Sequence, residues 1–166
     1  IYDATGFQKY LWIKHPYLFE YTDPVAGIGY NRTIYTAFTG DEALLNRAEA
    51  YVMKEDYTSA LADLNLWTTN ALVASQCSPV LTLDSVKEWA NGMEYYKWDV
   101  PTPKKKINNP FVTVQEGSDL EAMLQATLYI RRVEFLHYGM RFFDIKRHGI
   151  KIYRRQVGTA LEINKV

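Results

Sequence analysis

The sequence reads YIRRVEFLHYGMRFFDIKRHG from Tyr129 to Gly149, a stretch in which charged residues stand among large apolar ones. Upstream leucines recur at helical spacing and define an apolar stripe that runs on to Phe135. Arg131 and Glu134 fall inside this stripe rather than opposite it. Because a buried charge needs a partner, we predict that both residues are partly buried and paired, in a structural network rather than a catalytic one.

Spacing along the chain indicates which residues could form this network. Arg131 and Glu134 are three residues apart, so they can meet on one helix face. Asp144 follows after a break in the helix and can reach Arg141 or Arg132. We therefore expect a crossed ion-pair network at a helical corner.

A second stretch, TGDEALLNRAEAYVMKEDYTSALADLN, extends from Thr39 to Asn65. Its two halves resemble the E-x-L-x-R-A-E-A-Y and A-L-x-D-L-N helices of the SusD/RagB family of nutrient-binding outer-membrane lipoproteins. The stretch that ends at Gly149 resembles the closing motif of the same family. Ile130 and Tyr138 stand where the family usually has acidic residues. The matching charged residues are Arg47, Glu49, Arg131, Arg132, Glu134, Arg141 and Asp144.

The resemblance implies a mainly α-helical fold with tetratricopeptide-like helical hairpins and long irregular loops. Residues 1–166 would form the C-terminal part of one SusD/RagB-like domain. Within it we expect a helix pair at 39–76, a loop-rich insertion at 77–117 and closing helices at 118–149. The helix pair carries residues at the spacing of a tetratricopeptide repeat, namely Leu44, Ala48, Tyr51, Ala60 and Leu64. A lone repeat needs neighbours that bury its remaining apolar faces.

Local signals predict where regular structure begins and ends. Glycines and prolines punctuate residues 1–30, which predicts irregular structure, and the β-branched residues of 32–38 predict a short strand. A capped helix should run from about residue 40 to 54. Apolar periodicity predicts a second helix from residue 57, and a short helix is expected over 84–93.

The last third of the chain has clearer boundary signals. Ser118 and Glu121 form a capping-box pattern, which predicts the start of a long helix. Gly139 should end that helix, and Gly149 should end a shorter one that follows. The basic run Lys104–Lys106 is interpreted as a solvated loop tip rather than an anion site.

Composition limits the possible partners. The chain has 166 residues, 48% of them hydrophobic and 14% aromatic, which is enough for a sizeable core. Its 19 basic and 19 acidic residues cancel, so nucleic acid is not an expected partner. No apolar run reaches the roughly 18 residues of a membrane-spanning helix.

The resemblance also implies a cellular location. Family members carry a signal peptide and a lipidated cysteine, so we expect this chain to be a C-terminal piece whose protein is lipid-anchored at the cell surface of a Gram-negative outer membrane. Cys77 lies too far inside the chain to be that anchor. A single cysteine excludes an intrachain disulfide, and we expect a small buried side chain.

Catalytic and metal-binding patterns are weak in this sequence. Glu134 and His137 have the Glu-x-x-His spacing of di-iron bundles, but such a site needs two copies and further glutamates. Nucleophile elbows and the glycine-rich phosphate- and dinucleotide-binding fingerprints are absent. We therefore expect no enzyme activity, no cofactor and no metal.

Aromatic residues near polar loops are the candidates for ligand binding, because sugars lay their C–H faces on such rings. The best cluster is Tyr95, Tyr96 and Trp98, and Trp12 is a further candidate. The alternative is that these rings anchor the proline-rich loop onto the helices. The family resemblance implies capture of oligosaccharides at the cell surface and delivery to a SusC-like TonB-dependent transporter. A tetratricopeptide-like scaffold, or a SusD/RagB relative, that binds peptide or protein beside Leu44–Leu72 is the other hypothesis.

Overall fold

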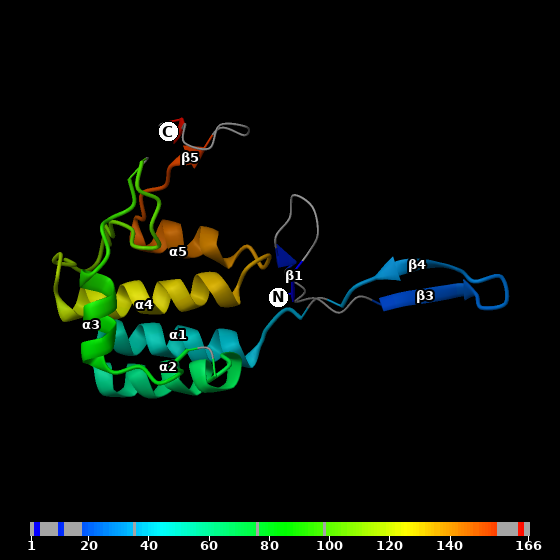
Figure 1. Cartoon of the computed structure of the whole chain (residues 1–166), viewed down its shortest axis with the longest axis horizontal. Helices are drawn as coiled ribbons and strands as arrows, with labels where there is room; N and C mark the ends of the chain where they lie inside the picture. The colour runs from blue at the N-terminus through cyan, green and yellow to red at the C-terminus, as the bar shows by residue number, and fades with distance from the viewer. Residues whose placement is uncertain are drawn as a thin grey trace. The chain divides into compact units, whose positions relative to one another are not determined.

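The computed structural model describes residues 2–3, 10–11, 18–34, 36–75, 77–97, 99–155 and 163–164, those at 2–3, 10–11, 154–155 and 163–164 by backbone only. The chain divides into two compact units, Ile1–Thr39 and Gly40–Val166, which are described separately. The first unit contains strands and the second holds five α-helices within its described residues (Figure 1). The prediction of a mainly α-helical fold is confirmed.

The first unit contains two antiparallel strand pairs. β1 (Tyr2–Asp3) pairs with β2 (Tyr10–Leu11), and β3 (Leu18–Asp23) pairs with β4 (Ile28–Arg32). In the β3–β4 turn, Asp23 Oδ1 accepts the backbone N–H groups of Val25 and Ala26, both at 3.0 Å. Such a side-chain turn, followed by a glycine with positive φ, closes the hairpin.

These strands correct two predictions. Residues 1–30 are not wholly irregular, because Pro24 and Gly27 lie in the turn that connects β3 and β4. The strand expected at 32–38 lies earlier. Arg32 is the last residue of β4 because it stands opposite Leu18, where β3 begins, and the described ladder ends there.

The second unit is built around α4 (Asp119–Glu134). α2 (Tyr57–Ala71), α1 (Gly40–Met53), α4 and α5 (Met140–His148) lie side by side in that order, each packed on the next (Figure 1). α3 (Leu83–Asn91) packs across α4, where Lys87 pairs with Asp119 at 2.7 Å. A short strand pair, β5 (Arg154–Arg155) with β6 (Ile163–Asn164), follows α5.

The α1–α2 hairpin forms where the sequence predicts a helix pair. Ala48 and Ala60 are both fully buried, and their small side chains allow the two helices to approach closely. Asp56 caps α2 by accepting the backbone N–H of Ser59 at 3.1 Å. Arg47 on α1 binds Asp63 on α2 through two hydrogen bonds of 2.8 and 2.7 Å, so a bidentate ion pair also joins the helices.

α4 is the central helix of this unit, since every residue from Leu120 to Leu128 is buried. Ser118 caps it as predicted, accepting the N–H of Glu121 at 3.1 Å. The reciprocal half of the capping box is absent, because the Glu121 carboxylate accepts the N–H of Gly117 instead, at 2.7 Å. The helix also ends earlier than predicted, at Glu134. Gly139, with φ of 75°, precedes α5 rather than terminating α4.

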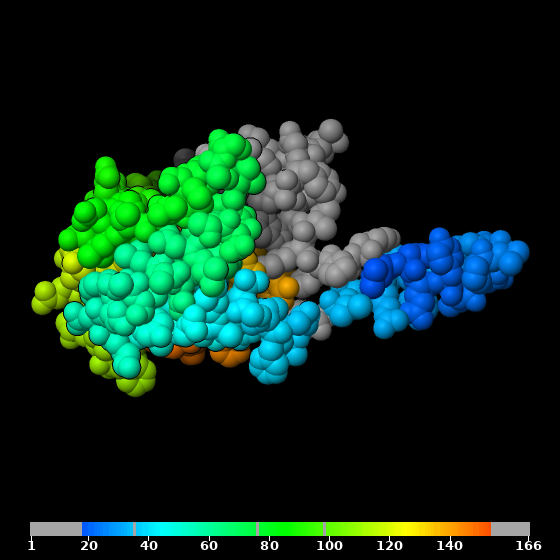
Figure 2. Space-filling model, turned by 90° about the horizontal axis from the view of Figure 1, so that it is seen from below, coloured from blue at the N-terminus to red at the C-terminus, as the bar shows by residue number. Residues whose placement is uncertain are grey.

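Two further elements lie near their predicted positions. α3 begins at Leu83, capped by Thr82 with a reciprocal bond from Ser85, and α5 ends at Gly149 with φ of 55°. Cys77, predicted to be buried, is exposed, because the segment after α2 runs over the surface rather than into the core. Figure 2 shows α1, α2 and α3 together on one face of the second unit.

Two leucines of α2 test this account of the core. Leu64 is fully buried and Leu66 is 53% exposed on the same helix. We expect Leu64→Ala to lower the free energy of unfolding by about 2–5 kcal/mol, because it leaves a cavity in the buried core beside α2. Leu66→Ala should change it by less than about 0.5 kcal/mol. Urea denaturation measures both, and equal losses would contradict the assignment.

Candidate functional site

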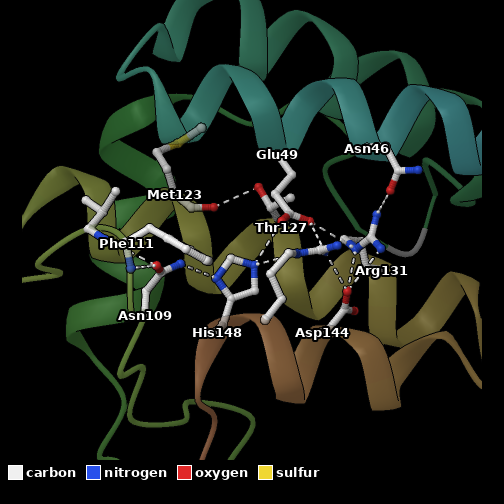
Figure 3. A network of polar contacts seen from close by, with 11 residues as sticks. Asn46, Glu49, Asn109, Phe111, Met123, Thr127, Arg131, Asp144 and His148 are labelled. Carbon is white, nitrogen blue, oxygen red and sulfur yellow. Dashed lines mark hydrogen bonds and ion pairs between the residues drawn. The ribbon is translucent and has the colours of Figure 1, made fainter.

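The charged residues of the two sequence motifs meet in one buried network. Glu49 comes from α1, Arg131 from α4, and Asp144 and His148 from α5, and their side chains converge between the three helices (Figure 3). Glu49 and Arg131 lie far apart in the sequence. The network therefore joins the first motif to the closing motif.

Arg131 is the centre of this network and is only 1% exposed. Its Nε and Nη2 donate to Asp144 Oδ1 at 3.1 and 3.0 Å, and its Nη1 donates to Asn46 Oδ1 at 2.5 Å. Glu49 Oε2 lies 3.4 Å from Arg131 Nε. The guanidinium thus contacts α1 and α5 from its place on α4, and two carboxylates balance its charge.

Glu49 receives two more partners from α5. Arg147 Nη2 lies 2.7 Å from Glu49 Oε2 and 3.0 Å from Asp144 Oδ1. His148 Nε2 lies 2.9 Å from Glu49 Oε1. Burial by itself would raise the pKa of Glu49, but the hydrogen bond from His148 and the charges of Arg147 and Arg131 outweigh it. The pKa of Glu49 therefore lies below its ordinary value.

A loop residue fixes the tautomer of His148. Asn109 Oδ1 accepts the backbone N–H groups of Phe111 and Val112 at 2.8 and 3.2 Å, which orients the amide (Figure 3). Its Nδ2 therefore faces His148 Nδ1, 3.0 Å away. Since Nδ2 can only donate, Nδ1 accepts and the imidazole carries its proton on Nε2, toward Glu49.

The structure confirms the burial and pairing of Arg131 but corrects its partners. The carboxylates that it contacts belong to Asp144 and Glu49, whereas Glu134 accepts the indole N–H of Trp67 at 3.2 Å. The prediction missed Glu49 because nothing in the spacing shows that α1 packs on α4. Glu49 was singled out only by the family motif.

Asp144 likewise pairs with Arg131 and Arg147 rather than with the predicted Arg141 or Arg132. Arg132 is exposed, because it is turned about 100° from Arg131 around the helix. Arg141 is half-buried beside a small cavity that Arg132 and Gln125 also line. Burial lowers the pKa of Arg141 despite the nearby charge of Asp144.

Tyr95 and Tyr96, the predicted ligand-binding residues, lie on the loop between α3 and α4. The Tyr95 hydroxyl donates to Glu121, and burial together with this bond raises the pKa of Tyr95. Tyr96 N–H donates to the carbonyl of Lys104 at 2.8 Å, which pairs two segments of the loop. Tyr95 therefore anchors the proline-rich loop on α4, which is the alternative to ligand binding considered for these rings. The Tyr96 ring instead stacks on Tyr153, with 5.5 Å between the ring centres.

The lysine run is only partly solvated, because Lys106 is exposed whereas Lys104 is buried and Lys105 is half-buried. Lys104 is buried, with its Nζ 3.7 Å from Glu121 and 4.5 Å from the centre of the Tyr95 ring. Lys105 Nζ lies 3.2 Å from the centre of the Tyr96 ring. The prediction was wrong because the tyrosines and Glu121 supply the partners that a run of like charges needs.

These residues line an open cleft of about 480 Å³, which we call the tyrosine–lysine cleft. Its lining consists of Glu94, Tyr95, Tyr96, Lys97, Lys105, Lys106, Lys151 and Tyr153. The volume falls within the range of about 300–1,000 Å³ that is typical of ligand pockets. Sequence reasoning found two of its tyrosines but not Tyr153, which comes from the segment after α5.

A second hollow, the apolar groove, has a volume of about 450 Å³. α2, α3 and α4 contribute its large side chains, Trp67, Trp89 and Tyr129, and Trp89 lies 5.5 Å from Tyr129 between ring centres. Thr68, Ser78 and Ser85 are the small polar residues of its lining. Nothing in the spacing of these three aromatic residues along the chain indicates that their rings come together.

Other predictions are tested only in part. Trp98 and Trp12 lie outside the described residues. In the described part of the chain, no three His, Cys, Asp or Glu side chains are grouped so as to hold a metal ion. His137 is exposed in a left-handed conformation just after α4. None of the described helices combines the length and apolar character needed to cross a membrane.

The chain was compared with family models, curated proteins and solved structures, and none of them matches it.

Removing the central guanidinium tests the network. Arg131→Met keeps most of the apolar stem but removes the two hydrogen bonds that Arg131 donates to the buried Asp144 and one of the cations that face Glu49. We expect a loss of about 3–5 kcal/mol in the free energy of unfolding. The exposed neighbour offers a matched control, because Arg132→Met should cost less than about 0.5 kcal/mol. If both variants lost the same amount in urea denaturation, Arg131 would not be the centre of the network.

The lowered pKa of Glu49 predicts an acid dependence of stability. A carboxylate with a lowered folded-state pKa stabilises the fold fully above its unfolded value, taken as 4.5, and loses that contribution as pH falls through the folded value. The free energy of unfolding of the native protein should therefore fall below about pH 4.5 more steeply than that of Glu49→Gln. Denaturation curves measured from pH 7 downward test this, and parallel pH profiles would contradict it.

Proposed function

We propose that this chain is part of a non-enzymatic, cell-surface nutrient-binding lipoprotein of the SusD/RagB type. It captures oligosaccharides and passes them to a SusC-like TonB-dependent transporter. A lipid anchor would hold the protein on the outer membrane of a Gram-negative cell, and neither a cofactor nor nucleic acid is required. The tetratricopeptide-like character of the α1–α2 hairpin belongs to the same proposal.

The observation that carries this proposal is the meeting of the two motif segments. The resemblance to the SusD/RagB family lies in two separate stretches of the sequence. Glu49 from the first stretch and Arg131 and Asp144 from the second form one buried network. Motif residues that hold a fold together fit a framework whose ligand contacts lie elsewhere, on loops.

The tyrosine–lysine cleft is the place where such a protein would bind cargo. It lies on the loop region between α3 and α4 and combines rings with polar tips and charged groups. Sugars bind through hydroxyl hydrogen bonds and contacts with aromatic side chains, and this lining offers both kinds of contact. None of the residues of the buried network is among the described residues that line this cleft.

The apolar groove favours a second candidate, a peptide-binding scaffold. Its lining is almost wholly apolar, with Trp67, Trp89 and Tyr129 at its walls. Such a groove suits a large apolar side chain of a peptide rather than a sugar, whose hydroxyls would lose hydrogen bonds there. The groove lies beside the C-terminal half of α2, which is the end of the segment Leu44–Leu72 beside which the peptide-binding hypothesis expects a groove.

Calorimetric titration with neutral and acidic oligosaccharides and with a pool of apolar peptides separates the two candidates. We expect saturable binding of an oligosaccharide that Tyr96→Ala weakens by about tenfold and Trp89→Ala leaves unchanged. Each variant thus serves as the control for the other site. Peptide binding that depends on Trp89 would support the scaffold instead.

The transport role needs a separate test in the cell. The intact protein should co-purify with a TonB-dependent transporter, and deletion of its gene should lower uptake of the bound oligosaccharide. Unchanged uptake, with no transporter in the purified complex, would refute the transport role even if the protein bound sugar in vitro.

A further inference from the structure

We propose that the tyrosine–lysine cleft takes an acidic oligosaccharide, one that carries carboxylate or sulfate groups. This inference rests on the proposed function, because it names the class of cargo for the same site. Three observations carry it: the position of the ammonium groups over the rings, the fixed backbone that presents them, and the local excess of positive charge.

The ammonium groups lie where a neutral sugar would stack. Lys105 Nζ lies 3.2 Å from the centre of the Tyr96 ring, and Tyr153 stacks on that ring as well, with 5.5 Å between ring centres. Lys104 and Lys106 both lie over the Tyr95 ring, at 4.5 and 5.0 Å from its centre. A neutral sugar could stack on these faces only by displacing the lysines, whereas an anionic group can bind the ammonium groups where they are.

The backbone that carries these lysines is held in place. Gln125 on α4 binds the backbone of Lys105 on both sides, accepting its N–H at 3.3 Å and donating to its carbonyl at 2.5 Å. Lys105 Nζ also donates to the carbonyl of Thr102 at 3.0 Å. A charged group that is positioned before the ligand arrives loses less conformational entropy on binding.

Charge is concentrated at this site although the whole chain is neutral. Among the described residues, the cleft is lined by Lys97, Lys105, Lys106 and Lys151 and by one carboxylate, that of Glu94, whereas the 19 basic and 19 acidic residues of the chain cancel. Ion pairs of Lys97 with Glu94, at 3.1 Å, and of Lys106 with Glu116, at 3.0 Å, are both exposed. Exposed ion pairs contribute little to the stability of a fold, so an anionic group of the ligand can replace Glu94 or Glu116 as the partner of the lysine with little loss of free energy.

Tyr96 and Tyr153 also line the cleft, and their hydroxyls can add the contacts that a sugar needs besides charge. A phenolic hydroxyl can donate to and accept from sugar hydroxyls, which an acidic peptide largely lacks. We therefore favour an acidic glycan over an acidic peptide. A short single-stranded nucleic acid also combines anionic groups with rings that stack, so it belongs among the comparisons.

The experiment compares four ligands of similar length by calorimetry: a galacturonate oligosaccharide, a neutral glucose oligosaccharide, a poly-glutamate peptide and a single-stranded oligonucleotide. The protein is used as the full chain, alongside Lys105→Met and Lys151→Met. Lys54→Met is the matched control, because Lys54 is exposed at the end of α1 and does not line the cleft. Circular dichroism of each variant confirms that it is folded.

We expect the galacturonate to bind more tightly than the neutral oligosaccharide and to lose affinity as salt is added. Lys105→Met and Lys151→Met should each weaken it by about tenfold, whereas Lys54→Met should have no effect. Equal binding of the neutral oligosaccharide, unchanged in the lysine variants, would overturn this inference and leave the proposed function standing. If only the peptide or the oligonucleotide bound, and its binding depended on the lysines, the inference would be overturned and oligosaccharide capture would lose its support. The same conclusion would follow if none of the four ligands bound.

Discussion

The buried guanidinium of Arg131 imposes the main constraint on the helical unit. A charge in the core is tolerated only when hydrogen-bonded counter-charges surround it, and its partners come from α1 and α5. Sliding α4 along either neighbour would separate Arg131 from Glu49 or Asp144 and leave charges unpaired. Apolar packing between these helices would allow several registers, whereas the ion network permits one.

This framework separates two tasks within the second unit. The network joins α1, α4 and α5 through side chains that are almost fully buried, so it has the character of a structural element. α4 also carries Glu121 and Gln125, which hold Tyr95 and Lys105 of the neighbouring loop. The same central helix therefore positions both the core and the tyrosine–lysine cleft.

Much of the helical fold could be predicted from local signals. Ser118 caps α4 where the sequence indicates, α2 begins at residue 57 as predicted, and Ala48 and Ala60 are buried in the hairpin. Contacts between distant segments could not be predicted in the same way. Nothing in local spacing reveals that Glu49 reaches Arg131, or that Tyr153 stacks on Tyr96, because such contacts depend on how helices pack. The lysine run was misread for the same reason, since its ring and carboxylate partners lie elsewhere in the chain.

A double-mutant cycle between Glu49 and Arg131 tests the central claim most directly. The free energy of unfolding is measured for the native protein, for Glu49→Gln, for Arg131→Met and for the double variant. If one network joins the two motif segments, the losses should be non-additive, with a coupling of about 0.5–3 kcal/mol. Additive losses would show that the two residues act independently, and the account of the fold built on their contact would be contradicted.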